Sequence, residues 1–154
     1  MGDDRPARAA HAGEPVGARI AEPVLAWLYA RALVAIARAD DRIDADEGVA
    51  LERCLAARLA APVAIDALLL AEPLEPSRLA DAVRSAGPFR GSGLAAPELA
   101  RLLIADGLAV VTAKGYVAEV EARELLRFAA ALGCGRDEVR ARFGAAAPWV
   151  GALA

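Results

Sequence analysis

The chain has few of the residues that carry most protein chemistry. Its 154 residues include a single lysine, Lys114, a single histidine, His11, and neither asparagine nor glutamine. The lack of asparagine excludes N-glycosylation. His11 has no partner nearby to orient its ring, so we do not expect it to act as a general base. Cys54 and Cys134 match neither a C-x-x-C motif nor a zinc spacing, which predicts two thiols rather than a disulfide or a metal site.

Basic clusters and long hydrophobic runs are also missing. The formal net charge is −3, and the basic residues form no run, which argues against a nucleic-acid partner. No apolar stretch approaches the roughly 20 residues that cross a bilayer. The first residues lack the basic start and apolar run of a secretory signal. We therefore expect a cytoplasmic protein without a transmembrane segment, whose partners include other proteins and, among them, membrane proteins.

What the chain has in abundance is apolar surface. Hydrophobic residues make up 57% of the sequence, enough for a core in a single domain of this length. Residues 1–20 lack periodic apolar positions and are expected to form a flexible, solvated arm. Residues 21–154 are expected to form one domain.

Apolar residues in this domain recur at helical spacing, with almost no strand pattern. This predicts an all-α bundle of about six or seven helices. The expected helices are Pro23–Asp40, Ala45–Ala60, Pro62 to about Glu72, Pro76–Ser85, Pro97 to about Ala113, Glu119–Leu132 and Arg136–Phe143. The expected core residues are Leu28, Leu33, Ile36, Leu51, Leu55, Leu102, Leu103, Val110, Leu125, Phe128 and Leu132.

The two halves of the chain resemble each other. Ala35–Glu47 aligns without gaps on Ala109–Glu121, and the register continues downstream, where Leu51 aligns with Leu125. Matching loop lengths, acids and apolar positions indicate a duplicated helix–loop–helix unit. We place the two copies at about 24–72 and 97–143.

The loop of the first copy follows the pattern A-x-A-D-x-x-I-D-x-x-E. Its matching residues are Ala37, Ala39, Asp40, Ile43, Asp44 and Glu47. This pattern between two apolar helices resembles the TerB-like family, named for tellurite resistance and linked to stress proteins. The resemblance implies a compact all-α bundle with pseudo-twofold halves, no established enzymatic activity, and metal contact through acidic loops. The second copy departs from the pattern, because Lys114 replaces the first acid and Ala118 the second.

Helix capping explains the same loop residues. Asp44 precedes the second helix and can accept hydrogen bonds from its first turn, while Glu47 can reach back to complete a capping box. Both acids also favour a helix N-terminus. Ala118 cannot cap through its side chain, which predicts a more frayed start for the equivalent helix.

Metal binding is the competing explanation. Five carboxylates lie within eight residues, a density that suits a hard cation with oxygen ligands. They belong to Asp40, Asp41, Asp44, Asp46 and Glu47. The spacing is not that of an EF-hand, because the twelfth position counted from Asp40 is Leu51. A cation bound here would be weakly held and would use Asp40, Asp44 and Glu47 first. We expect no other cofactor.

Two further features are candidates for function. Asp106 lies within an apolar helical stripe, so it is expected to be buried with a hydrogen-bond or arginine partner, or else to contact a ligand. Trp27, Arg31 and Arg38 form a second stripe on the first long helix, a combination enriched at protein contacts. Trp27 would otherwise be a core residue covered by the C-terminal segment Pro148–Val150.

The sequence offers no nucleophile–base pair, phosphate loop or dinucleotide fingerprint, so we do not expect an enzyme. The favoured hypothesis is a non-enzymatic TerB-like module that binds another protein in stress or metal-linked physiology. Two alternatives stay open, a divalent-cation sensor built on the acidic loop and a ligand-binding helical bundle that uses Asp106.

Overall fold

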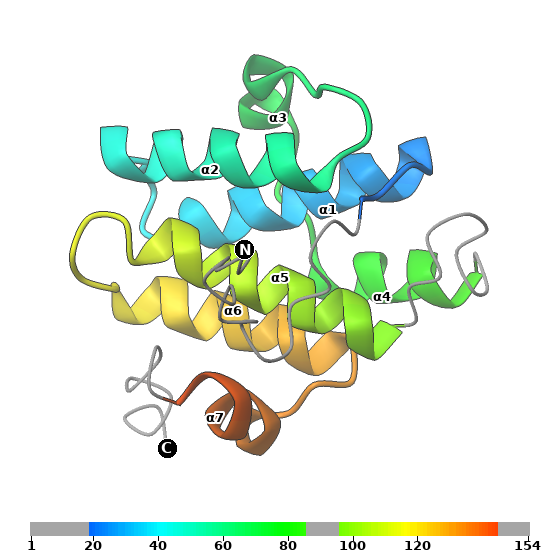
Figure 1. Cartoon of the computed structure of the whole chain (residues 1–154), viewed down its shortest axis with the longest axis vertical. Helices are drawn as coiled ribbons and strands as arrows, with labels where there is room; N and C mark the ends of the chain where they lie inside the picture. The colour runs from blue at the N-terminus through cyan, green and yellow to red at the C-terminus, as the bar shows by residue number, and fades with distance from the viewer. Residues whose placement is uncertain (1–18, 86–95, 145–154) are drawn as a thin grey trace, which may run out of the picture.

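The computed structural model describes residues 19–85 and 96–144, and these residues form an all-α bundle (Figure 1). The helices are α1 (Pro23–Ala37), α2 (Ala45–Arg58), α3 (Ile65–Leu70), α4 (Pro76–Ser85), α5 (Ala96–Val111), α6 (Glu119–Ala131) and α7 (Arg136–Phe143). The predicted fold class is therefore confirmed for the described part of the chain. The segment Pro148–Val150 lies outside the described residues.

Local signals account for most helix ends. Pro23 is the first residue of α1, and the Glu22 carboxylate accepts hydrogen bonds from the backbone N–H groups of Val24 and Leu25 at 3.1 and 2.6 Å. Pro62 does not open α3, contrary to expectation, because α3 begins only at Ile65. Its N-cap residue is alanine, which has no side-chain acceptor, so the short α3 depends on packing rather than on a cap.

The duplicated unit is visible in the backbone. The last residue of α1, Ala37, aligns with the last residue of α5, Val111, and the two following helices also begin at aligned residues. Between them, Asp41 has a φ of 70° and its aligned residue Gly115 a φ of 90°. Glycine adopts this left-handed conformation without steric cost, and aspartate is among the other residues that tolerate it best. The two loops therefore share a backbone turn although their side chains differ.

The two halves pack with the first helix of each half against the helices of the other half. The α1 and α5 helices contact one another at the centre, and each also packs against the second helix of the other half, α6 and α2 respectively (Figure 1). The two connecting loops, between α1 and α2 and between α5 and α6, consequently lie at the same end of the bundle. This arrangement brings the aligned loops face to face.

The core lies along α1 and α5. All eleven predicted core residues are buried, and Tyr29 and Phe128 are the largest fully buried side chains. Gly107 on α5 allows close approach, because a Cβ at that position would lie 2.7 Å from Leu125 Cδ1 of α6. The helix that carries the candidate residue Asp106 is therefore held tightly against α6.

The folded domain begins earlier than the predicted boundary at residue 21. Ile20 is only 1% exposed, and it exchanges backbone hydrogen bonds with Arg58 O at 2.8 Å and Ala60 N at 3.0 Å. Ile20 belongs to the hydrophobic core, where burial of its side chain is favourable, although the composition of the segment around it predicts a solvated arm. Residues 1–18, including His11, lie outside the described residues.

Candidate functional site

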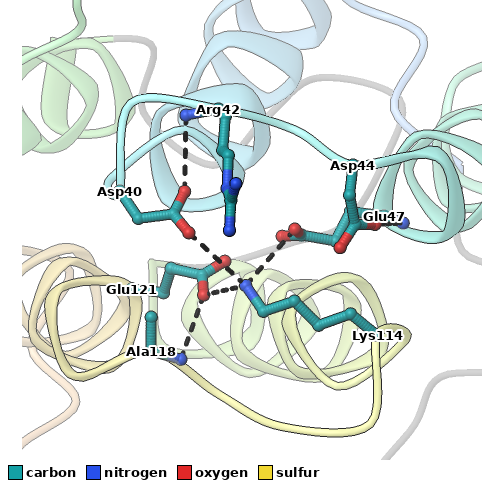
Figure 2. Close-up of polar contacts among 7 residues, drawn as sticks. All are labelled: Asp40, Arg42, Asp44, Glu47, Lys114, Ala118 and Glu121. Atoms are coloured by element: carbon teal, nitrogen blue, oxygen red, sulfur yellow. Dashed lines mark hydrogen bonds and ion pairs between the residues drawn. The ribbon is translucent and has the colours of Figure 1, made fainter.

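The two aligned loops meet around the ammonium group of Lys114. Its Nζ lies 3.3 Å from Glu47 Oε1 and 3.7 Å from Asp40 Oδ2, and it also donates a hydrogen bond to Glu121 Oε1 (Figure 2). Lys114 also makes a cation–π contact, because its Nζ lies 5.0 Å from the centroid of the Tyr116 ring. We call Asp40, Glu47, Lys114 and Glu121 the loop cluster.

The loop cluster is shielded from solvent. The Lys114 side chain is 4% exposed, and the side chains of Glu47 and Glu121 are 1% and 0% exposed. One oxygen of each glutamate, Oε2, is buried without a hydrogen-bond partner. Buried carboxylates are costly unless they are paired, so the single ammonium leaves part of the cluster's charge uncompensated.

The pKa values reflect this imbalance. The pKa of Glu47 is raised to about 7, first by burial and then by the neighbouring Glu121, while Lys114 opposes both effects. A proton held between the two glutamates would provide a donor for the unpaired oxygens. Burial lowers the pKa of Lys114, but its hydrogen bonds to Glu121 and Glu47 outweigh this and raise the pKa overall, so Lys114 stays charged.

The helix caps differ between the copies. Asp44 Oδ1 accepts a hydrogen bond from Glu47 N at 2.8 Å, which confirms the predicted N-cap of α2. Glu47 does not complete the expected capping box, because its carboxylate binds Lys114 instead. In the second copy, Glu121 Oε1 accepts a hydrogen bond from Ala118 N at 3.0 Å. This is the one hydrogen bond of a capping box that does not depend on the side chain of the N-cap residue.

The five predicted metal ligands do not converge on one point. Asp44 faces its own helix, Asp40 and Glu47 contact Lys114, and Asp41 and Asp46 are exposed. Within residues 19–85 and 96–144, no group of three or more His, Cys, Asp or Glu side chains is arranged to hold a metal ion. The carboxylates nearest to such a site are those already bound to Lys114.

Asp106 is buried, as predicted, and has two partners. Its carboxylate accepts hydrogen bonds from Tyr29 Oη at 2.5 Å, from Arg58 Nε at 2.9 Å and from Arg58 Nη2 at 3.2 Å. Burial and the Asp106 charge raise the pKa of Tyr29, so its hydroxyl remains a donor. Burial lowers the pKa of Arg58, but Asp106 outweighs that effect. Both carboxylate oxygens are thus engaged, and the triad joins α1, α2 and α5.

The predicted contact stripe borders a groove of about 550 Å³. Its residues are Arg31, Val34, Ala35 and Arg38 of α1, Leu68–Leu70 of α3, Ala71–Glu75 of the following connection, Glu124 and Arg127 of α6, and Ala39 and Asp41. We call this the α1–α3–α6 groove. Trp27 does not line this groove, and its side chain is partly buried against the core.

Arginines fix the walls of the α1–α3–α6 groove. Arg31 Nη2 donates to Glu72 O at 2.7 Å, and Arg38 Nη1 donates to Leu69 O at 2.8 Å. Arg31 Nε is buried without a hydrogen-bond partner. Leu70 at the rim is 87% exposed, and Leu69 is 39% exposed. The groove therefore combines an apolar rim with fixed guanidinium groups.

The sequence did not single out Glu121, Tyr29 or Arg58. Glu121 carried a usable signal, because it aligns with Glu47 and the chain's only lysine lies in the same aligned segment, at the position of Asp40. Tyr29 and Arg58 carried none, since neither helical spacing nor motif relates them to Asp106. Cys54 and Cys134 form no disulfide, and burial raises the pKa of Cys134 to about 11.

None of the described helices is both long and apolar enough to cross a membrane. The chain matches no protein-family model, no curated protein and no solved structure. The likeness to the TerB-like family therefore rests on the loop residues of the first copy and on the duplicated helix–loop–helix unit.

Proposed function

We propose that this protein is a non-enzymatic, TerB-like module that binds another protein through the α1–α3–α6 groove. The observation that carries the proposal is the exposure of Leu70 beside fixed arginines. A side chain that is 87% exposed gains apolar burial only in a complex. Arg31 and Arg38 belong to the stripe whose composition already favoured a contact surface.

The chemistry of the groove defines the partner it fits. Leu69 and Leu70 offer apolar surface, and Arg31 Nε is a buried donor without an acceptor. A partner segment that places an apolar side chain on the leucines and a carboxylate near Arg31 would satisfy both. Stress or metal-linked physiology in the cytoplasm is the setting that the TerB-like resemblance favours for such a module.

Residues with catalytic potential are scarce in the described part of the chain, which supports a binding role. The buried Cys134 is held as a thiol by its raised pKa and is a poor nucleophile at neutral pH. Asp106 is engaged by Tyr29 and Arg58 on both oxygens, so the ligand-binding alternative lacks an available carboxylate there. These observations favour the groove over an internal reaction site.

The groove is tested by comparing the wild type with Leu70→Asp and Arg31→Ala in affinity capture from the native host, followed by binding measurements on the purified partner. We expect at least a tenfold rise in Kd for Leu70→Asp, because a charge is placed on the apolar rim. Val24→Asp is the matched control, since Val24 is 63% exposed on α1 but does not line the groove. Equal binding by Leu70→Asp and wild type would exclude this surface.

The acidic loop needs a separate test, because a cation sensor remains the second candidate function. The change of Asp40, Asp44 and Glu47 to Asn, Asn and Gln keeps hydrogen-bonding capacity and removes charge. A folded variant that loses partner binding would favour a functional loop. Unchanged binding with lowered thermal stability would leave these acids as structural residues.

A further inference from the structure

The loop cluster has the composition of a cation site. Three carboxylates from two loops surround one point, and an ammonium group occupies it. The Oε2 atoms of Glu47 and Glu121 are buried without hydrogen-bond partners. Two unpaired buried carboxylate oxygens need a further hydrogen-bond donor or positive charge besides the one lysine.

The internal repeat places Lys114, the cation of the loop cluster, at a position where the first copy has a carboxylate. Glu47 aligns with Glu121, and both contact the ammonium group. Asp40 aligns with Lys114, and the following residues, Asp41 and Gly115, share the left-handed turn. The same backbone position thus supplies a carboxylate from one loop and the cation from the other.

We propose that the ammonium group of Lys114 takes the place of a divalent metal ion between the two loops. In this arrangement the ammonium group occupies the position between the carboxylates, so the wild-type protein cannot bind a metal ion there. Lys114 then joins the two halves as a bridging ion would, because its partners Glu47 and Glu121 lie on α2 and α6.

The ligand chemistry supports the substitution. Carboxylate oxygens are the preferred ligands of calcium, magnesium and manganese, and calcium accepts mixed mono- and bidentate carboxylates. An ammonium group offers three N–H donors, which matches the three carboxylates by number but leaves two oxygens unpaired. A divalent ion with added waters would engage those oxygens.

The test compares cation responses of the wild type and Lys114→Ala at about pH 8, after removal of metals with EDTA. Calcium, magnesium and manganese are each titrated alone, with calorimetry and thermal unfolding as readouts. We expect no cation-specific change in wild-type Tm. Lys114→Ala should have a lower Tm in EDTA and gain about 5–10 °C at a metal concentration about 100 times its Kd.

The matched control is Lys114→Ala combined with Glu47→Gln and Glu121→Gln, which removes the ammonium group together with two carboxylates. This variant should be indifferent to all three cations. The proposal is overturned if wild type and Lys114→Ala respond equally, or if Lys114→Ala responds to none of the cations.

A second readout covers the case in which Lys114→Ala does not fold in EDTA. The helical circular dichroism signal should then return on adding one of the three cations, and failure to return with any of them overturns the proposal. Lys114→Ala with Glu47→Gln alone carries less buried charge and repeats the titration in a milder background. It should bind the same cation more weakly than Lys114→Ala does.

Discussion

At the scale of single residues, the environment of Glu47 separates it from its neighbours in the acidic loop. Its side chain is 1% exposed and contacts both Lys114 and a second buried glutamate. Asp46, next to it in sequence, is exposed. Two acids that are adjacent in the sequence therefore differ in how their charge affects the free energy of unfolding.

The first prediction concerns the pH dependence of stability. The pKa of Glu47 is about 7 in the folded state and 4.5 without the fold. Between these values the folded state binds more protons than the unfolded state, so the contribution of Glu47 to the free energy of unfolding falls as pH rises from about 4.5 to about 7. Glu47→Gln removes this titration. Urea denaturation between about pH 5 and pH 8 should show a smaller loss of stability in the variant than in wild type.

Glu52→Gln is the control for this prediction, because Glu52 lies exposed on the same helix. Its pH dependence should follow that of wild type. If Glu47→Gln lost as much stability as wild type over this pH range, the buried glutamate would not be the group that titrates.

At the scale of secondary-structure elements, the starts of α2 and α6 are capped by different halves of one motif. Asp44 caps α2 from its side chain, and Glu121 returns to the backbone of Ala118 at the start of α6. The predicted fraying of α6 is thus opposed by a residue that the repeat retained. The start of α2 therefore lacks the return hydrogen bond from the glutamate, and the start of α6 lacks the side-chain acceptor at the N-cap.

The second prediction uses this complementarity. Asp44→Ala should lower the free energy of unfolding by about 1 kcal/mol, the usual loss for an N-cap acceptor. Ala118→Asp should raise it by about 1 kcal/mol or less, because it adds the missing acceptor at the aligned position. Chemical denaturation of both variants measures the pair. A clear loss of stability in Ala118→Asp would contradict the equivalence of the two loops.

The third prediction tests the inner face of α5. Leu103 is 1% exposed, so Leu103→Ala should cost about 2–5 kcal/mol through lost burial and a cavity. Leu70→Ala is the matched control, because the same change at an 87% exposed leucine should stay within about 0.5 kcal/mol of wild type. A loss below about 1 kcal/mol for Leu103→Ala would mean that α5 packs differently.

At the scale of the whole molecule, two buried polar clusters join elements that are distant in sequence. The loop cluster joins the two copies at one end of the bundle. Asp106 on α5 binds Tyr29 of α1 and Arg58 of α2. Such clusters favour one arrangement of the helices over others, because any alternative packing would leave charged groups buried without partners.

The fourth prediction measures this cost. Asp106→Ala leaves the buried guanidinium of Arg58 without its carboxylate and should cost about 3–5 kcal/mol. Replacing both partners, with Asp106→Leu and Arg58→Met, should cost clearly less, because no buried charge remains. Chemical denaturation of the single and double variants gives the comparison. Equal losses in the two variants would show that packing, rather than the ion pair, sets the cost.

The sequence by itself determined the elements of this protein. Apart from the start of α3, apolar periodicity placed the helices and all eleven predicted core residues, and Asp44 marked the start of α2. These features depend on interactions within a few residues along the chain, which a local pattern contains. The alignment of the halves predicted the paired loops for the same reason, since each loop is a local structure.

Only the tertiary structure decided which side chains meet. In the sequence, Lys114 is only a departure from the motif, whereas the fold places its ammonium group between Glu47 and Glu121. The apolar stripe around Asp106 predicts a partner for this carboxylate, but only the fold shows that Tyr29 and Arg58 supply it. The groove beside Leu70 likewise exists only where α1, α3 and α6 come together. These contacts depend on how helices distant in sequence cross, and the spacing of residues along any one helix does not contain that information.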